Sequence, residues 1–411
     1  MASVYTAGTG YVVLEVCTIL HTGHYVVLSN LIGDPNDAFF GLCAHRSDIT
    51  STFSTIEFYN SVIGSVAKKL NPLSLARIAG YTASSIAKGG DLTSAIALLE
   101  TVDLGDAVAP ITFVESKLVM LKLLASPNDT NVLEEVRKML SKGKERLQLS
   151  GDSGEDSSST KSTYGVVKAV TSGSDMALVY AAYYEASMLY RKHVGPPEAF
   201  YQEALNYLNY TSVSDIPGED AFTLATDLSL AALTGEGVFH FGEVVLSLEI
   251  LKVLKGTQNE WLMELMRCCA DGDVGQFMAV TNRPDVQEKI QAQPALTARA
   301  DAVKEKIVLL SLINLVFERP SHERKISFEE IATRCMLSST NDVEKVVMRA
   351  LSLGLIRGEI DQVDQEVFIY WVMPRVLDTS QMMALSKRFG EWAVKSSKVA
   401  DHMIEHASHF S

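Results

Sequence analysis

The pattern that comes closest to metal chemistry lies near the C-terminus of the sequence. His402, Glu405 and His406 follow the HxxEH spacing, which on a helix is the arrangement of an inverted zinc-protease motif. That chemistry needs a further carboxylate ligand, normally well downstream, and the sequence ends at Ser411. We therefore expect His402 and His406 to be packing or solvated histidines rather than zinc ligands.

A second pattern has the residue types of a serine nucleophile. Gly151–Gly154 reads Gly-Asp-Ser-Gly, as in the nucleophile loop of chymotrypsin-like proteases, but Glu155 stands where a second glycine would follow. A helical chain cannot supply the two β-barrels that position that catalytic triad. We expect no serine protease site.

Two further groups of residues have types that bind cofactors or metals in other proteins. Gly235, Gly237 and Gly242 lack the GxGxxG spacing of a dinucleotide site and follow a helical pattern rather than a strand. The N-terminal cysteines and histidines match no zinc-finger spacing: Cys17, His21, His24, Cys43 and His45. The sequence therefore predicts no enzyme, no cofactor and no metal site.

Composition and charge exclude further classes of protein and of function. The 411 residues carry 36 Lys plus Arg against 50 Asp plus Glu, a net charge of −14, and 47% of residues are apolar. Such a chain is globular rather than disordered, and its acidity disfavours non-specific binding to nucleic acid or anionic membranes. Five cysteines without a CxxC spacing indicate a reducing compartment. The apolar stretch 11–32 contains Glu15, His21 and His24, so we expect no membrane span.

Helical patterns separated by short breaks fill residues 56–300. Asn71-Pro72 stops one helix and opens the next, and Gly89-Gly90-Asp91 does so through flexibility and an N-cap. Ala182, Ala186 and Ala204 supply small residues where paired helices need to approach closely. No strict 34-residue repeat occurs, so we expect a mainly α protein with an irregular α-solenoid of tetratricopeptide-like helix pairs.

Two segments interrupt this helical array or precede it. Residues 148–163 form a polar, Ser-rich run that cannot offset its ordering entropy, and we expect a mobile insert there. Residues 1–55 show none of the helical patterning and form a separate N-terminal segment.

Residues 301–377 have the element order of a winged helix-turn-helix. An apolar helix ends before Pro320, and a short strand over 325–328 follows. Capping-box spacings at Ser327/Glu330 and Asn341/Glu344 predict two short helices. Strands over 356–360 and 366–372 then form a hairpin around a polar tip.

The charge of this segment distinguishes a winged helix that binds nucleic acid from one that binds another protein. Residues 325–377 contain six basic and eight acidic residues, and Asp342 and Glu344 open the helix that would read DNA. Asp361 and Asp364 occupy the wing tip, where they would meet phosphates with like charge. We therefore expect a protein partner, bound by strand addition at an edge strand. The residues expected to form that edge are Val367, Ile369 and Trp371.

The residue pattern over 378–411 predicts one long helix. Its apolar positions follow one another in steps of three and four residues, the 3.5-residue period of a coiled coil or helix bundle. Because a complete domain precedes this helix, its partner is expected to be another chain, the alternative being that the helix folds back on its own array. The candidate contact residues are Leu385, Phe389, Trp392, Val399 and Met403.

An α-solenoid followed by a winged helix and a terminal helix resembles the PCI-domain architecture. The sequence itself is similar to the family of non-ATPase regulatory subunit 13 of the 26S proteasome. The similarity is strong from about residue 200 onward, moderate over 56–101 and absent over the first 50 residues. The strings that carry it are Leu70–Leu75, Gly235–Glu243, Phe328–Ala332, Ala350–Asp364 and Trp371–Asp378.

The resemblance implies a cytoplasmic and nuclear scaffold subunit of the proteasome lid. Lid PCI subunits join through their winged-helix domains, and their terminal helices gather in one bundle. The solenoid would project outward near the ubiquitin-receptor subunit, and catalysis would lie in other subunits. Two alternatives remain at this point: a PCI subunit of the signalosome or of a translation-initiation complex, and a winged helix that binds nucleic acid.

Overall fold

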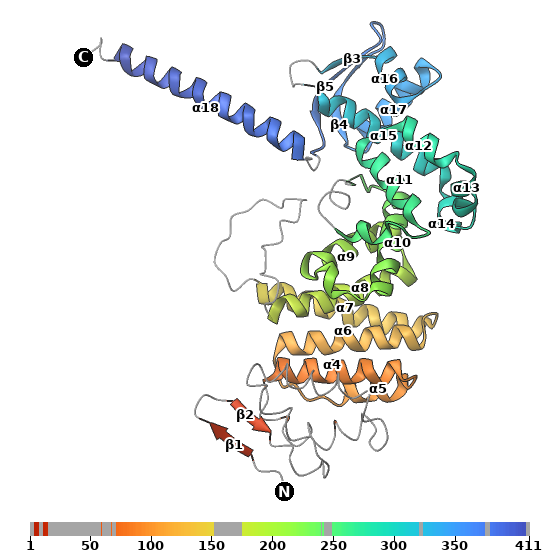
Figure 1. The fold of residues 1–411 in the computed structure, drawn as a ribbon, viewed down its shortest axis with the longest axis vertical. Helices are drawn as coiled ribbons and strands as arrows, with labels where there is room; N and C mark the ends of the chain where they lie inside the picture. Colours follow the sequence, from red (N-terminus) through yellow and green to blue (C-terminus); the bar gives the residue numbers. More distant parts are fainter. Residues whose placement is uncertain are drawn as a thin grey trace. The chain divides into compact units, whose positions relative to one another are not determined.

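The computed structural model describes most of the chain. The described residues are 4–7, 11–14, 59, 67, 71–151, 175–239, 241, 249–319, 324–374 and 379–407. The protein is mainly α-helical (Figure 1), and its contacts divide it into two compact units. The first unit comprises Met1–Gly195 with Gln202–Ser212, and the second comprises Pro196–Tyr201 with Val213–Ser411.

Two helices of the first unit begin at the caps that the sequence predicts. The Asn71 side chain accepts a hydrogen bond from the Leu73 amide at 3.0 Å and caps the first helix of the array, and Asp91 caps the next one through the Ser94 amide at 3.0 Å. Each cap satisfies a backbone amide that the helix itself leaves unpaired. The helices are α4 (Pro72–Lys88), α5 (Leu92–Glu100), α6 (Val108–Ala125), α7 (Thr130–Gly151) and α8 (Asp175–Val194).

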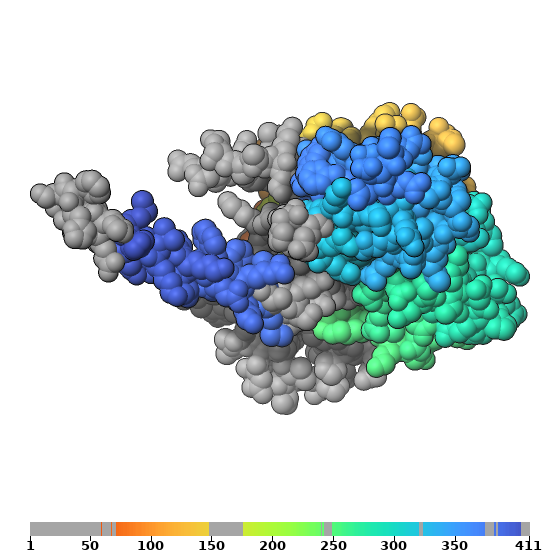
Figure 2. All heavy atoms as spheres, turned by 90° about the horizontal axis from the view of Figure 1, so that it is seen from above, coloured from red at the N-terminus to blue at the C-terminus, as the bar shows by residue number. Residues whose placement is uncertain are grey.

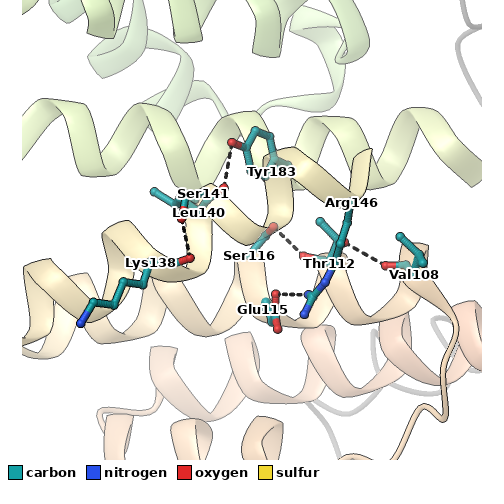
Figure 3. Close-up of polar contacts among 9 residues, drawn as sticks. All are labelled: Val108, Thr112, Glu115, Ser116, Lys138, Leu140, Ser141, Arg146 and Tyr183. Atoms are coloured by element: carbon teal, nitrogen blue, oxygen red, sulfur yellow. Dashed lines mark hydrogen bonds and ion pairs between the residues drawn. The ribbon is translucent and has the colours of Figure 1, made fainter. Parts of the chain in front are cut away.

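Helix α6 is the centre of this unit. It contacts α4, α5, α7 and α8, so its apolar residues are distributed around the helix instead of along one stripe. Hydroxyl groups on α6 bond within their own helix: Thr112 donates to the Val108 carbonyl at 2.8 Å, and Ser116 donates to the Thr112 carbonyl at 2.7 Å. Tyr183 of α8 donates to the Leu140 carbonyl of α7 at 3.2 Å (Figure 3). These three hydroxyl groups are therefore hydrogen-bonded although they lie among packed helices.

The first four residues of the expected Ser-rich insert at 148–163 are helical, contrary to the prediction. Helix α7 continues to Gly151, so residues 148–151 are helical rather than part of a loop. Residues 152–174 lie outside the described residues. The predicted small residues Ala182, Ala186 and Ala204 are all buried.

The second unit contains a run of short helices after α9 (Pro197–Tyr210), whose residues are divided between the two units. Three of the starts carry a proline at the first helical turn, where its missing amide costs nothing. The elements are α10 (Gly218–Thr234), a 3-10 helix (Glu249–Leu254), α11 (Glu260–Asp271), α12 (Val274–Thr281), α13 (Pro284–Gln291), α14 (Pro294–Ala298) and α15 (Ala300–Glu318).

The winged helix-turn-helix follows α15 in the expected order. The elements are β3 (Lys325–Ser327), α16 (Phe328–Cys335), α17 (Thr340–Ser352), β4 (Ile356–Asp361) and β5 (Glu366–Val372). Ser327 caps α16 as predicted, accepting from the Glu330 amide at 3.3 Å. Asn341 does not cap α17. Ser339 does so instead, two residues earlier, by accepting from the Asp342 amide at 3.2 Å.

The remaining described elements lie at the two ends of the chain. Helix α18 (Thr379–Ala407) has 29 residues, which corresponds to about 43 Å. Strands β1 (Val4–Ala7) and β2 (Tyr11–Leu14) form an antiparallel hairpin that the sequence analysis does not predict. Among the described helices, none is long and apolar enough to cross a bilayer.

Candidate protein-interaction surfaces

The winged-helix sheet has three strands in the order β3-β5-β4, all antiparallel. Strand β5 is therefore the central strand, and the prediction that it forms an edge is wrong. The reason is β3, which pairs with β5 through Ile326 opposite Val367 and occupies the side that a hairpin alone would leave open. The free edges of the sheet belong to β3 and β4.

The expected contact residues on β5 divide between two environments. Val367 and Ile369 are fully buried, because β5 alternates and its inner face packs against the helices of the module, including α15. Trp371 is half-buried, and the Arg357 guanidinium lies over its ring, 4.9 Å from the ring centroid. Val367 and Ile369 thus stabilise the fold and are not available to a partner.

The outer face of the sheet carries aromatic residues that the sequence analysis did not single out. Phe368 is 49% exposed and Tyr370 is 60% exposed. Phe368 pairs with Lys325 on β3 and with Glu359 on β4, so one basic and one acidic residue are its neighbours across the sheet. The signal was present in the sequence, since the solvent-facing positions of a hairpin are usually polar and here they are aromatic.

A glycine makes this arrangement possible. The register shifts between Arg357, which pairs with Trp371, and Gly358, which pairs with Ile369, so β5 has one extra residue, Tyr370, at that point. A Cβ atom on Gly358 would collide with the Phe368 carbonyl oxygen of the neighbouring strand. The backbone of β4 can therefore approach β5 only with glycine at this position.

The acidic residues of the winged helix lie where the sequence places them. Asp342 sits in the first turn of α17, and hydrogen bonds from Ser339 and Lys345 lower the pKa of its carboxyl, which keeps it charged. At the wing tip the Asp361 carboxylate accepts from the amides of Val363 and Asp364 at 3.0 and 3.1 Å. Negative charge thus occupies the two positions that would contact DNA in a nucleic-acid-binding winged helix.

The second candidate surface is on α18. Every described side chain of this helix is exposed, including five large apolar residues on one line. Their exposed fractions lie between 39% and 69%, and the space-filling view shows side chains of α18, in dark blue, protruding from the helix (Figure 2). We call this set the apolar stripe: Leu385, Phe389, Trp392, Val399 and Met403.

The described cysteines have the properties of core residues. Cys268, Cys269 and Cys335 are buried, and burial raises their thiol pKa to about 11, 12 and 11. A thiol that stays protonated at neutral pH is a poor nucleophile. Within the described residues, no three His, Cys, Asp or Glu side chains are grouped as a metal site would require. The N-terminal cysteines and histidines, for which no metal site is expected, lie outside the described residues, and so does the side chain of His406.

The sequence of this chain matches two protein-family models. A model described as PCI domain matches residues 277–371, and a model described as PSD13 N-terminal repeats matches residues 42–266. The chain is therefore a PCI-domain protein, as its winged-helix fold already indicates. Because the second match covers more than half of the sequence, the chain belongs to the family of 26S proteasome non-ATPase regulatory subunit 13. The resemblance inferred from the sequence is confirmed.

Individual relatives agree with this assignment. The chain is 31% identical over 348 residues to "26S proteasome non-ATPase regulatory subunit 13" of Dictyostelium discoideum, covering 85% of this chain and 82% of the relative. It is 34% identical over 344 residues to homolog A of that subunit from Arabidopsis thaliana, covering 83% and 81%. A weaker similarity, 26% over 201 residues, relates 48% of the chain to "Eukaryotic translation initiation factor 3 subunit M" of Aspergillus terreus, of which it covers 41%.

Proposed function

We propose that this protein is a non-catalytic scaffold subunit of the proteasome regulatory-particle lid. It supports lid assembly, and through it ubiquitin-dependent protein degradation, by contacts of its winged helix and of α18 with other lid PCI subunits. Its place is the cytoplasm and the nucleus. Family membership supports the assignment to the proteasome, and the exposed apolar stripe on α18 is the single structural observation that carries the scaffold role.

The energetics of the apolar stripe favour a helical partner. Full burial of one large apolar side chain is worth about 1.5–3 kcal/mol relative to full exposure, and the five members of the stripe are 39–69% exposed, so their burial supplies roughly 5–10 kcal/mol. Association itself costs about 4–15 kcal/mol. The stripe is therefore strong enough to dock α18 in a bundle that other contacts also hold together. Its steps of three and four residues suit packing against other helices.

The winged-helix contact belongs to the outer face of the sheet. Phe368 and Tyr370 are exposed aromatic residues, and Trp371 borders them beneath Arg357. Aromatic and arginine side chains are the types that most often dominate protein interfaces. This face replaces Val367 and Ile369 as the proposed contact. The solenoid is proposed to lie near the ubiquitin-receptor subunit, following the resemblance.

Purification of the full-length tagged chain from its native cells, with quantitative mass spectrometry of its companions, tests the assignment. The proposal predicts proteasome regulatory subunits in near-stoichiometric amounts. Initiation-factor or signalosome subunits in place of proteasome subunits would contradict it. The partial similarity to initiation factor 3 subunit M makes this the alternative to measure.

A further inference from the structure

A lysine lies inside an otherwise apolar part of α15. Lys306 is only 6% exposed, and its neighbours Ile307, Leu309 and Leu310 are fully or almost fully buried. Removing an ammonium group from water is costly unless it gains hydrogen bonds or compensating charge. The contacts of Lys306 therefore indicate what its charge does in this fold.

The ammonium bonds the end of a neighbouring helix. Its Nζ donates to the carbonyl oxygens of Ala232 at 2.9 Å and Gly235 at 2.5 Å, at the C-terminal end of α10. Arg299, at the start of α15, donates to the Thr234 carbonyl between them at 2.9 Å. The C-terminal carbonyls of a helix have no partners within it and carry the negative end of its dipole. Two cations of one element thus bond the terminal carbonyls of another.

Aromatic rings complete the surroundings. The Lys306 Nζ lies 5.8 Å from the ring centroid of Phe239 and 5.5 Å from that of Phe241, and both rings are buried. At these distances a ring face attracts a cation. We call the two carbonyl oxygens, of Ala232 and Gly235, together with these two rings the Lys306 site.

Gly235 is required for this geometry. A Cβ atom at this position would lie 2.7 Å from the Ala231 carbonyl oxygen and 3.2 Å from the Glu198 amide nitrogen, too close for any side chain. Gly235, Phe239 and Phe241 all belong to the string Gly235–Glu243 that the sequence analysis identified without assigning it a role. The described part of that string supplies most of the Lys306 site.

We propose that Lys306 is a noncovalent cross-link between α10 and α15, which holds the segment after α10 in place beside the helix leading into the winged-helix module. Helix α15 also contacts α16 and β5 of the winged helix. The segment after α10 is therefore held against a helix that packs on the winged-helix module. Burial lowers the pKa of Lys306 to about 8, and the ammonium remains the main form at pH 7. This role is independent of any partner of the protein.

Hydrogen exchange on the full-length chain, read by mass spectrometry, tests the proposal at pH 7. In Lys306→Met, amides in peptides covering 231–241 should exchange at least about tenfold faster, since two carbonyls lose their donor. Peptides from α6 should exchange as in the wild type. Lys304→Met is the matched control, because Lys304 lies on the same helix and is exposed. It should leave the 231–241 peptides unchanged.

Two results would overturn the cross-link. One is wild-type exchange at 231–241 in Lys306→Met, and the other is an equal rise throughout the chain, which indicates general destabilisation. If Lys306→Met does not fold, Lys306→Gln is measured in the same way, because a shorter, neutral amide cannot reproduce the ammonium contacts. Faster exchange confined to 231–241 then supports the proposal, and wild-type exchange there rejects it.

Discussion

Single polar side chains inside the helical layers determine how neighbouring helices meet. Tyr183 on α8 bonds the Leu140 carbonyl of α7, and Lys306 on α15 bonds carbonyls at the end of α10. In both cases a long side chain reaches a backbone oxygen on another helix. A hydrogen bond of this kind sets the position of one helix along the other, which apolar contacts alone leave loosely defined.

The lowered pKa of Lys306 predicts a pH dependence of stability. Between pH 8 and about 10.5 the folded lysine loses its proton while the unfolded lysine keeps it, so the unfolded state binds more protons. The free energy of unfolding of the wild type should therefore rise with pH relative to that of Lys306→Met, by at most about 1.4 kcal/mol per pH unit. Urea unfolding of both proteins at pH 7 and pH 9.5 measures the difference.

The comparison with Lys306→Met cancels the titrating groups that do not interact with Lys306. Glu198, Glu236, Arg299 and the Cys269 thiol do interact with it electrostatically, so the difference between the two proteins reports Lys306 together with these neighbours. A difference in unfolding free energy that does not change with pH would show that the ammonium is not desolvated as the structure indicates.

Tyr183→Phe tests the hydrogen bond between α7 and α8. The Leu140 carbonyl lies within a helix and keeps its backbone partner, so the loss should be modest, about 0.5–1.5 kcal/mol in the free energy of unfolding. Tyr370→Phe is the matched control, because its hydroxyl lies on an exposed residue and its removal should change little. Equal stability of Tyr183→Phe and wild type in urea unfolding would contradict this role.

At the scale of elements, local signals in the sequence predicted several helix starts and the order of the winged-helix elements. Asn71, Asp91 and Ser327 were recognisable as caps because capping depends on residues two or three positions apart. The start of α17 was misplaced, because Ser339 and Asn341 are both good caps and only the backbone conformation decides between them.

Pairing between distant elements could not be predicted in the same way. The alternation of β5 was visible, but nothing in it shows that β3, far back in the chain, pairs on its second side. The same limit applies to the Lys306 site, since Gly235 and Lys306 are joined only by folding. Sequence periodicity did find the apolar stripe, because all of its members lie on one helix.

The two faces of β5 predict opposite effects of substitution. Replacing Phe368 and Tyr370 together by Ser should leave stability nearly unchanged and weaken association with the lid, because both side chains are exposed. Ile369→Ala should instead cost about 2–5 kcal/mol in the free energy of unfolding, because it opens a cavity in the module. Thermal unfolding and co-purification of each variant separate the two effects. Normal lid association of the Phe368/Tyr370 variant would exclude the outer face as a contact.

At the scale of the whole molecule, the proposed function requires surfaces that bind other proteins. The family models match residues 42–266 and 277–371, and α18 begins after both, at Thr379. Yet α18 carries the longest line of exposed apolar side chains in the described chain, on a protein with a net charge of −14. A large exposed apolar surface on an otherwise charged protein marks an interaction site. We therefore expect the proposed scaffold role to depend most on α18.

The incorporation of full-length variants into purified proteasomes tests that dependence most directly. Phe389→Ser with Trp392→Ser removes two members of the apolar stripe, and Lys387→Ser with Lys398→Ser changes exposed residues of the same helix outside it. The scaffold account predicts that the first variant folds but is largely absent from proteasomes, whereas the second is incorporated as the wild type is. Wild-type incorporation of the Phe389/Trp392 variant would contradict the account.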